Sequence, residues 1–157
     1  KLYQFMDRNP MLEMHPVDLT NDPYLAGQND NLIAINGTMQ IDFIGQCGSE
    51  SQGARAYSGT GGQTDFVRSA NRSKGGKAFI VTPSTAKDDT ISRIVPTLTA
   101  GTHVTTGKND VNYVVTEYGV AQLRGKSAKE RAKALISIAH PKFRDQLTED
   151  AKKMKLL

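Results

Sequence analysis

The chain has 157 residues, of which 38% are hydrophobic and 23% are charged, as is usual for one globular domain with its own core. No apolar run approaches the roughly 20 residues that a membrane-spanning helix needs, so a membrane protein of that kind is excluded. The net charge of +4 fits a mildly basic surface, or a surface that attracts an anionic ligand such as a phosphorylated cofactor.

The first thirty residues predict short elements. The chain begins without Met inside an amphipathic segment, so we expect it to be part of a longer polypeptide. Residues 12–17 suit a short extended segment, with Pro10 before it and Pro16 near its end. Residues 20–23, with a capping side chain followed by Pro23, predict the start of a brief helix.

Two strands are predicted next, over residues 32–35 and 39–44. Asn36 and Gly37 between them permit a tight connection with positive φ. In the second strand apolar and polar side chains alternate, which is the period of a half-buried strand; the alternating residues are Met39, Gln40, Ile41, Asp42 and Phe43.

A stretch rich in Gly and Ser, residues 45–62, is predicted to be a loop. It leads into an amphipathic helix over residues 64–71. A strand follows at residues 78–82, and a second loop, residues 83–87, lies at the carboxyl end of that strand.

The remaining chain predicts three strands and then two helices. The strands cover residues 91–95, 104–105 and 113–116. Ser127 caps the first helix and Glu130 completes a capping box, while Pro141 begins the second helix, which runs to about residue 155. Strands interleaved with helices predict an α/β fold, an open layered sheet that is mixed and mostly parallel, with helices on both faces.

Gly59, Gly61 and Gly62 directly precede the first predicted amphipathic helix. Glycines let backbone N–H groups approach a ligand, and a helix N-terminus adds free N–H groups and the positive end of its dipole. The pattern predicts a site for an anion or an oxyanion, although a flexible surface loop explains it equally well. No Gly-Lys-Ser/Thr follows, so it is not a P-loop, and it lacks the third glycine of a dinucleotide-binding loop.

Other candidate residues lie in or beside loops. Ser84 and Lys87 follow a predicted strand and would suit a phosphate or a pantetheine carbonyl, although a solvated turn is the commoner outcome. Glu117 ends another strand and could orient a neighbour, act as a base or cap a following helix. Asn36 and Glu50 border loops and allow similarly mixed interpretations.

Metal and serine-hydrolase chemistry have no support in the sequence. His15, His103 and His140 lie far apart without the spacing of metal ligands, and Cys47 has no CxxC partner, so no metal is expected. No serine stands in a motif that identifies an activating base. The single cysteine also rules out internal disulfides and fits a reducing cytoplasm, which is the compartment we expect.

Several motifs occur in a fixed order along nearly the whole chain. The most specific are SGTGGQTDFVR at 58–68, PSTAK at 83–87, ISRIVP at 91–96 and VTEYGVA at 115–121, after NP at 9–10 and TNDP at 20–23. Any one of them could arise by chance. The ordered set resembles the C-terminal domain of the acetyl-CoA hydrolase / 4-hydroxybutyrate CoA-transferase family.

This resemblance implies an enzyme with two similar open α/β domains, with CoA and the active site between them. It implies that a glutamate attacks the acyl-CoA thioester, giving an acyl-glutamyl anhydride and then a glutamyl-CoA thioester. The acceptor carboxylate takes over CoA by the reverse steps. In the family this glutamate lies upstream of the first motif, and nothing here matches its surroundings; Glu13 and Glu50 stand in the wrong context to replace it.

The resemblance also assigns roles to the glycine-rich loop. It makes Gly59 the candidate donor of the oxyanion N–H, with Gly61, Gly62 and Gln63 shaping the loop at the thioester.

The same resemblance assigns the remaining site residues. CoA would contact Ser84 and Lys87, the latter through a phosphate. Asn36 and Glu117 would line or brace the catalytic pocket.

We therefore expect residues 1–157 to be the C-terminal domain of a CoA-transferase, inactive alone. Its expected partners are the N-terminal domain of the same polypeptide, an acyl-CoA and a short carboxylate such as 4-hydroxybutyrate or acetate. A homo-oligomer is compatible with the sequence, whereas no metal, nucleic acid or membrane is expected to bind.

Two alternatives stay open. An acetyl-CoA hydrolase would use the same intermediate with water as the acceptor. A non-catalytic module that binds nucleic acid through the basic residues 126–133 is a weaker alternative, since aromatic residues make up only 6% and no base-stacking motif is present.

Overall fold

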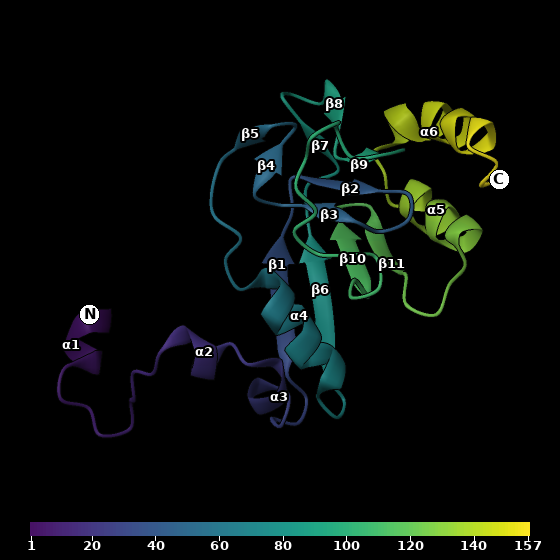
Figure 1. The fold of residues 1–157 in the computed structure, drawn as a ribbon. Helices are drawn as coiled ribbons and strands as arrows, with labels where there is room; N and C mark the ends of the chain where they lie inside the picture. Colours follow the sequence, from purple (N-terminus) through teal and green to yellow (C-terminus); the bar gives the residue numbers. More distant parts are fainter.

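The computed structural model describes residues 1–157, and its centre is a four-stranded sheet in the order β1-β6-β10-β11 (Figure 1). Strands β1 (Ile33–Gly37), β6 (Lys77–Val81) and β10 (Tyr113–Thr116) run parallel. Strand β11 (Gly119–Gln122) forms an antiparallel hairpin with β10. The predicted α/β class and the mixed, mostly parallel sheet are confirmed.

Smaller sheets gather beyond the carboxyl ends of the parallel strands (Figure 1). One has three strands in the order β3-β2-β9, and two others have two strands each. The strands concerned are β2 (Gln40–Asp42), β3 (Cys47–Gly48), β9 (Ile94–Val95), the pair β4 (Ser51–Gln52) and β5 (Arg55–Ala56), and the pair β7 (Thr85–Ala86) and β8 (Ile91–Ser92).

Three longer helices confirm the predicted ones within a few residues. They are α4 (Gln63–Arg72), α5 (Ala128–Ser137) and α6 (Pro141–Lys153). The capping box of α5 forms as expected, since Ser127 and Glu130 satisfy each other's backbone N–H groups. At the start of the chain lie three short helices, α1 (Leu2–Met6), α2 (Val17–Thr20) and α3 (Pro23–Ala26).

The hydrophobic core lies on one face of the four-stranded sheet. Alternate strand residues point to this face and are buried, namely Ala34, Ala78, Ile80, Val114 and Ala121. Helix α4 supplies Val67 and Ala70 to the same core, and α5 supplies Leu135 and Ile136. Thr116, on the core-facing side of β10, donates to the carbonyl of Ile138 just after α5, so both helices cover the same face.

The opposite face of this sheet carries no helix of this chain. Ile33, Ile35, Val81 and Val120 point to it and are 49%, 69%, 39% and 59% exposed. The expected helices on both faces are therefore not found here, because all the helices that contact the sheet gather on its other side.

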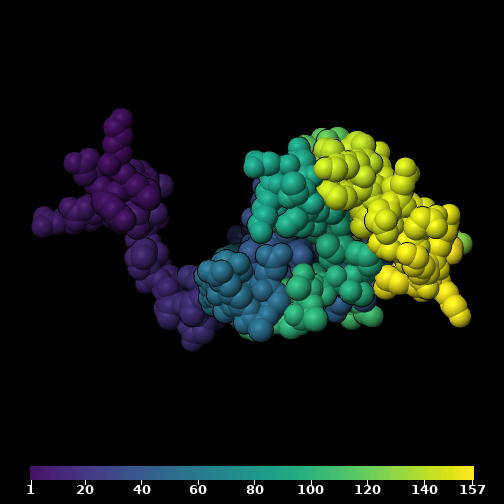
Figure 2. Space-filling model, turned by 90° about the horizontal axis from the view of Figure 1, so that it is seen from above, coloured from purple at the N-terminus to yellow at the C-terminus, as the bar shows by residue number.

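The N-terminal arm projects away from the body of the molecule (Figures 1 and 2). Helix α1 buries no residue, and the apolar side chains of this arm are exposed. The extended segment expected at 12–17 ends at Pro16, because Val17 begins α2. The brief helix predicted after residue 20 is α3, and Asp22 caps it by accepting from the N–H groups of Tyr24 and Leu25.

The strand predicted at 39–44 is shorter and more buried than expected. Asp42 accepts from the backbone N–H groups of Ile44 and Gln46 and so turns the chain after β2. Gln40 and Asp42 are only 5% and 3% exposed, and β2 has a partner strand on each side. The tight connection expected at Asn36 and Gly37 is wrong, since both belong to β1.

Other differences concern short elements that the sequence pattern does not show. The predicted loop at 45–62 contains β3, β4 and β5, and the strand predicted at 91–95 splits at Arg93, whose side chain donates to the carbonyls of Thr85 and Met39. No strand forms at 104–105. The next residue, Thr106, makes one isolated β-bridge with Cys47. Strand β11 was not anticipated. None of the helices combines the length and apolar character needed to cross a bilayer.

Candidate functional site

The glycine-rich loop, residues 58–62, lies at the carboxyl edge of the parallel strands. A turn of four residues joins the end of α4 to the start of β6, so α4 runs antiparallel to β6 and begins at the opposite edge (Figure 1). Asn36, Ser84 and Glu117 lie at or just after the ends of β1, β6 and β10. The topology thus brings all the predicted site segments to the edge where open α/β sheets bind ligands.

Two of the three glycines in the loop have a backbone conformation or a close neighbour that disfavours a side chain. Gly61 has a φ of +64°, in the left-handed region that favours glycine. A Cβ on Gly62 would lie 2.5 Å from the side-chain nitrogen of Asn21. Gly59 is different, because its φ is ordinary and a Cβ there would meet nothing within 4 Å. The chain leaves open space beside Gly59.

A continuous series of backbone donors runs through this loop. The N–H groups of residues 59–65 have no acceptor within the chain, and α4 has no side-chain cap. Successive free N–H groups at a helix N-terminus, together with the helix dipole, favour negative charge nearby. The loop can therefore stabilise an anion or a developing oxyanion.

Glu117 and Ser84 form a closely hydrogen-bonded pair. Ser84 is fully buried, its N–H donates to Oε2 of Glu117 at 2.9 Å, and its hydroxyl donates to Oε1. Burial by itself raises the pKa of Glu117, but hydrogen bonds from the Ser84 hydroxyl and from two backbone N–H groups, with the charge of His140, outweigh burial and lower the pKa. Glu117 is thus an ionised carboxylate that holds the 83–87 loop, and it does not cap a helix.

Lys87 is exposed in the turn between β7 and β8, with a φ of +50°. A 370 Å³ cavity reaches from this turn to Tyr57, the residue just before the glycine-rich loop. Its polar lining includes Lys87, Arg93 and Gln52. The cavity connects the two loops that the sequence singled out.

Asn36 carries an unused donor. Its side-chain nitrogen is buried and has no hydrogen-bond partner in the chain. A buried amide group without a partner is uncommon and costs stability unless a ligand or water satisfies it.

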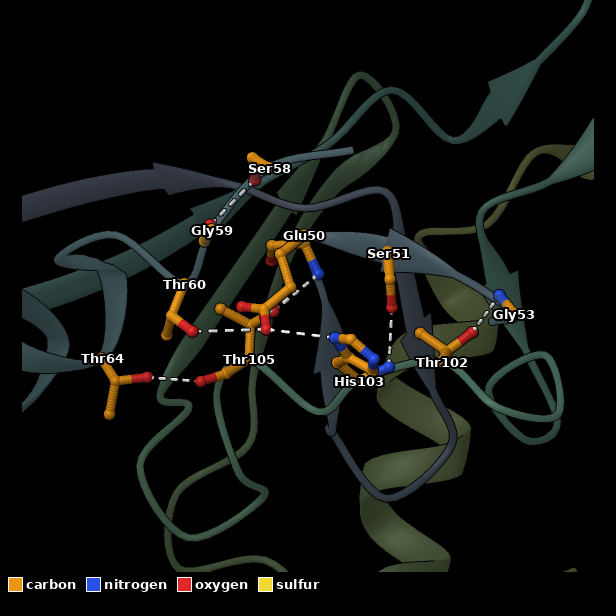
Figure 3. A network of polar contacts seen from close by, with 11 residues as sticks. Glu50, Ser51, Gly53, Ser58, Gly59, Thr60, Thr64, Thr102, His103 and Thr105 are labelled. Carbon is orange, nitrogen blue, oxygen red and sulfur yellow. Dashed lines mark hydrogen bonds and ion pairs between the residues drawn. The ribbon is translucent and has the colours of Figure 1, made fainter. Parts of the chain in front are cut away.

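Sequence reasoning missed the polar network beneath the glycine-rich loop (Figure 3). Gln63 points inward, and its side-chain nitrogen donates to the Thr106 hydroxyl at 3.1 Å. Thr64 donates to the carbonyl of Thr105 at 2.5 Å. Glu50, noted only as a loop-bordering residue, is at the centre of the network. No group of three His, Cys, Asp or Glu side chains is arranged to hold a metal ion.

Residues 1–151 match the family model described as the acetyl-CoA hydrolase/transferase C-terminal domain. The chain belongs to this family. The resemblance drawn from the sequence motifs is thereby confirmed.

Individual relatives of this acetyl-CoA hydrolase/transferase domain are similar to the chain over nearly its whole length. The chain is 63% identical to a succinyl-CoA:cyclohexane-1-carboxylate CoA transferase of Geobacter metallireducens, with 98% of the chain and 35% of that protein aligned. It is 55% identical to the 4-hydroxybutyrate coenzyme A transferase of Clostridium kluyveri, over 98% of the chain and 36% of that protein. The crystal structure of RipA from Yersinia pestis superposes with a TM-score of 0.92 at 49% identity, covering 99% of this chain and 35% of RipA. The chain spans about a third of the length of these relatives.

Proposed function

We propose that this chain is the C-terminal domain of a CoA-transferase that moves CoA between an acyl-CoA thioester and a short carboxylate. The observation that carries the proposal is the series of unpaired N–H groups at residues 59–65, beside the open space at Gly59. The names of the CoA-transferases that align with the chain support this reaction class.

In the proposed reaction a glutamate elsewhere in the polypeptide attacks the thioester carbonyl. The carbonyl oxygen becomes negative, and the Gly59 N–H donates to it. CoA leaves as the thiolate, giving an acyl-glutamyl anhydride, and then attacks the glutamyl carbonyl to give a glutamyl-CoA thioester and the free carboxylate. An acceptor carboxylate reverses these steps and leaves with CoA.

The other residues of the site bind and orient in this proposal. Lys87 lines the 370 Å³ cavity and offers its ammonium group to a phosphate of CoA. Asn36 donates its unused N–H to an oxygen of the substrate. Ser84 acts through Glu117, since its hydroxyl and its N–H are already used by that carboxylate.

We also propose that the N-terminal part of the same polypeptide covers the bare face of the four-stranded sheet. Parallel strands are normally buried on both faces, whereas Ile35 and Val120 are 69% and 59% exposed here. The aligned relatives are about three times as long as this chain, so they contain further polypeptide outside the aligned part. A cytoplasmic location and a homo-oligomer stay predictions.

The test is CoA transfer by this chain alone and by the longer polypeptide that contains it. We expect no turnover from the chain alone, and transfer from acetyl-CoA to added 4-hydroxybutyrate by the longer protein. Turnover by the chain alone at the rate of the longer protein would show that the nucleophile is misplaced. CoA release that does not depend on an added carboxylate would identify the hydrolase alternative.

A further inference from the structure

Glu50 is a buried carboxylate that contacts the glycine-rich loop with both its backbone and its side chain (Figure 3). Its side chain is only 11% exposed. The backbone carbonyl of Glu50 accepts from the N–H groups of Tyr57 at 2.8 Å and Ser58 at 3.3 Å. Its carboxylate accepts from the Thr60 hydroxyl in a longer contact of 3.4 Å. Glu50 therefore holds the chain on both sides of Gly59.

We propose that Glu50 is a positioning residue, which fixes the Gly59 N–H in the direction needed to stabilise the oxyanion. This inference rests on the proposed function of the loop. Glu50 does not touch the reacting atoms in this account. It acts on them through the loop alone.

The glycine-rich loop needs such a support from outside. Gly59 and Gly61 have wide backbone freedom, and Gly59 itself has no neighbour within 4 Å of a Cβ position. Oxyanion stabilisation depends on donors that are already in place, and a misplacement of about 1 Å can cost roughly 10² in rate. The order of Gly59 must therefore come from the residues that flank it.

The support is itself anchored in the core. Thr105 donates its hydroxyl to the Glu50 carboxylate at 3.0 Å, and its carbonyl accepts from Thr64 in the first turn of α4. The backbone of Thr105 is fixed in turn by the fully buried Cys47, whose carbonyl accepts its N–H at 2.8 Å. Thr105 thus supports both ends of the glycine-rich loop, the start through Glu50 and the end through Thr64.

The groups around the Glu50 carboxylate suit a side chain that accepts at both of its oxygens. The hydroxyls of Thr105 and Thr60 lie at its oxygens, and Nδ1 of His103 lies 3.5 Å from Oε1. A carboxylate accepts at both oxygens, whereas an amide of the same shape accepts at one and donates at the other. The Glu50→Gln substitution therefore removes part of the support while keeping the volume.

The experiment combines a measurement of loop order with kinetics. In Glu50→Gln and in Thr60→Val, we expect the ¹⁵N order parameter of Gly59 to fall from about 0.85 toward 0.6, the range of a flexible segment. In the longer polypeptide, kcat should fall roughly 10²-fold in Glu50→Gln and less in Thr60→Val, while KM for the acyl-CoA changes little. Thr60→Ser, which keeps the hydroxyl, should leave the order parameter of Gly59 and kcat at their unmodified values.

The control is Glu149→Gln, since Glu149 is an exposed glutamate on α6 and should change neither quantity. If Glu50→Gln does not fold, Thr60→Val still tests the inference, because Thr60 is exposed. Wild-type order at Gly59 and wild-type kcat in a folded variant would reject the role of Glu50. Absence of CoA transfer by the unmodified longer protein would reject the proposed function, while the order parameters would still test Glu50.

Discussion

Single residues in the glycine-rich loop differ in why they are glycine, although the sequence shows them alike. Gly61 is favoured by its own backbone conformation, and a side chain on Gly62 would displace the side chain of Asn21. Neither reason applies to Gly59, which agrees with its proposed contact with a ligand. A side chain at Gly61 is therefore expected to affect folding, and a side chain at Gly59 the proposed reaction.

A pair of alanine substitutions tests this distinction. Gly61→Ala should lower the free energy of unfolding by about 1–2 kcal/mol, because alanine resists a φ of +64°. Gly59→Ala should change it by less than about 0.5 kcal/mol, as for an open surface position. Urea denaturation of the chain measures both. Equal destabilisation by the two substitutions would contradict the assignment of Gly59 to a ligand.

The ionised state of Glu117 predicts a pH dependence of stability. The pKa of this carboxylate is lowered in the folded state, so the unfolded state binds the proton more readily in acid. Its contribution to stability is present above the unfolded pKa and disappears as the pH falls through the folded pKa. Glu117→Gln should therefore lose stability near neutral pH and less of it in acid.

Urea denaturation between pH 3 and pH 7 measures this effect, with Glu149→Gln as the matched exposed control. An identical loss for Glu117→Gln at every pH would show that the hydrogen bonds from Ser84 do not depend on the charge.

At the scale of elements, the helices follow from local sequence and the small strands do not. Helix α5 was predictable because its capping box and its apolar stripe lie within one segment. Strands β3, β4 and β7 have two residues each, too few to show an alternating pattern. Strand β9 forms because Ile94 meets Ile41 of β2, far away in the sequence. Local periodicity carries no information about such partners.

The same limit applies to the site. Gly59, Ser84 and Glu117 stand in motifs, and the ends of parallel strands predict where they meet. Glu50 could be noted only as bordering a loop, since the hydroxyls that it accepts from belong to residues 10 and 55 positions away. The pairing of Ser84 with Glu117 spans 33 positions and was equally hidden.

Packing of α5 on the sheet gives a prediction at this scale. Leu135 is fully buried between α5 and the core, so Leu135→Ala should lower the free energy of unfolding by about 2–5 kcal/mol through lost burial and a cavity. Lys133→Ala, at an exposed position of the same helix, should leave it nearly unchanged. Thermal or urea denaturation distinguishes the two. A similar small effect of both would mean that α5 is not part of the cooperative core.

The whole molecule has one complete core and one bare sheet face. The complete core explains how the chain can fold around α4 and α5. Exposed apolar side chains on the other face, among them Ile35, lie beside the stacked rings of Phe79 and Tyr113, whose centroids lie 5.2 Å apart. A large exposed apolar patch usually marks an interface.

Substitution on this face tests which partner covers it. Ile35→Lys should weaken association with the separately expressed N-terminal part by at least tenfold, since a buried charge without a partner is costly. It should not lower the stability of the chain alone, because Ile35 is 69% exposed. Lys129→Glu, on the outer side of α5, is the control. Unchanged association would show that the N-terminal part does not cover this face, and loss only of self-association would assign the face to another copy of the chain.

The most direct test of the account concerns the Gly59 N–H itself. Replacing the amide of Gly59 by an ester removes this one donor and leaves every side chain in place. The account predicts that CoA transfer by the longer polypeptide then loses roughly 10²–10³ in kcat, as for other oxyanion donors, with KM for the acyl-CoA nearly unchanged. An ester variant that transfers CoA at the unmodified rate would contradict it.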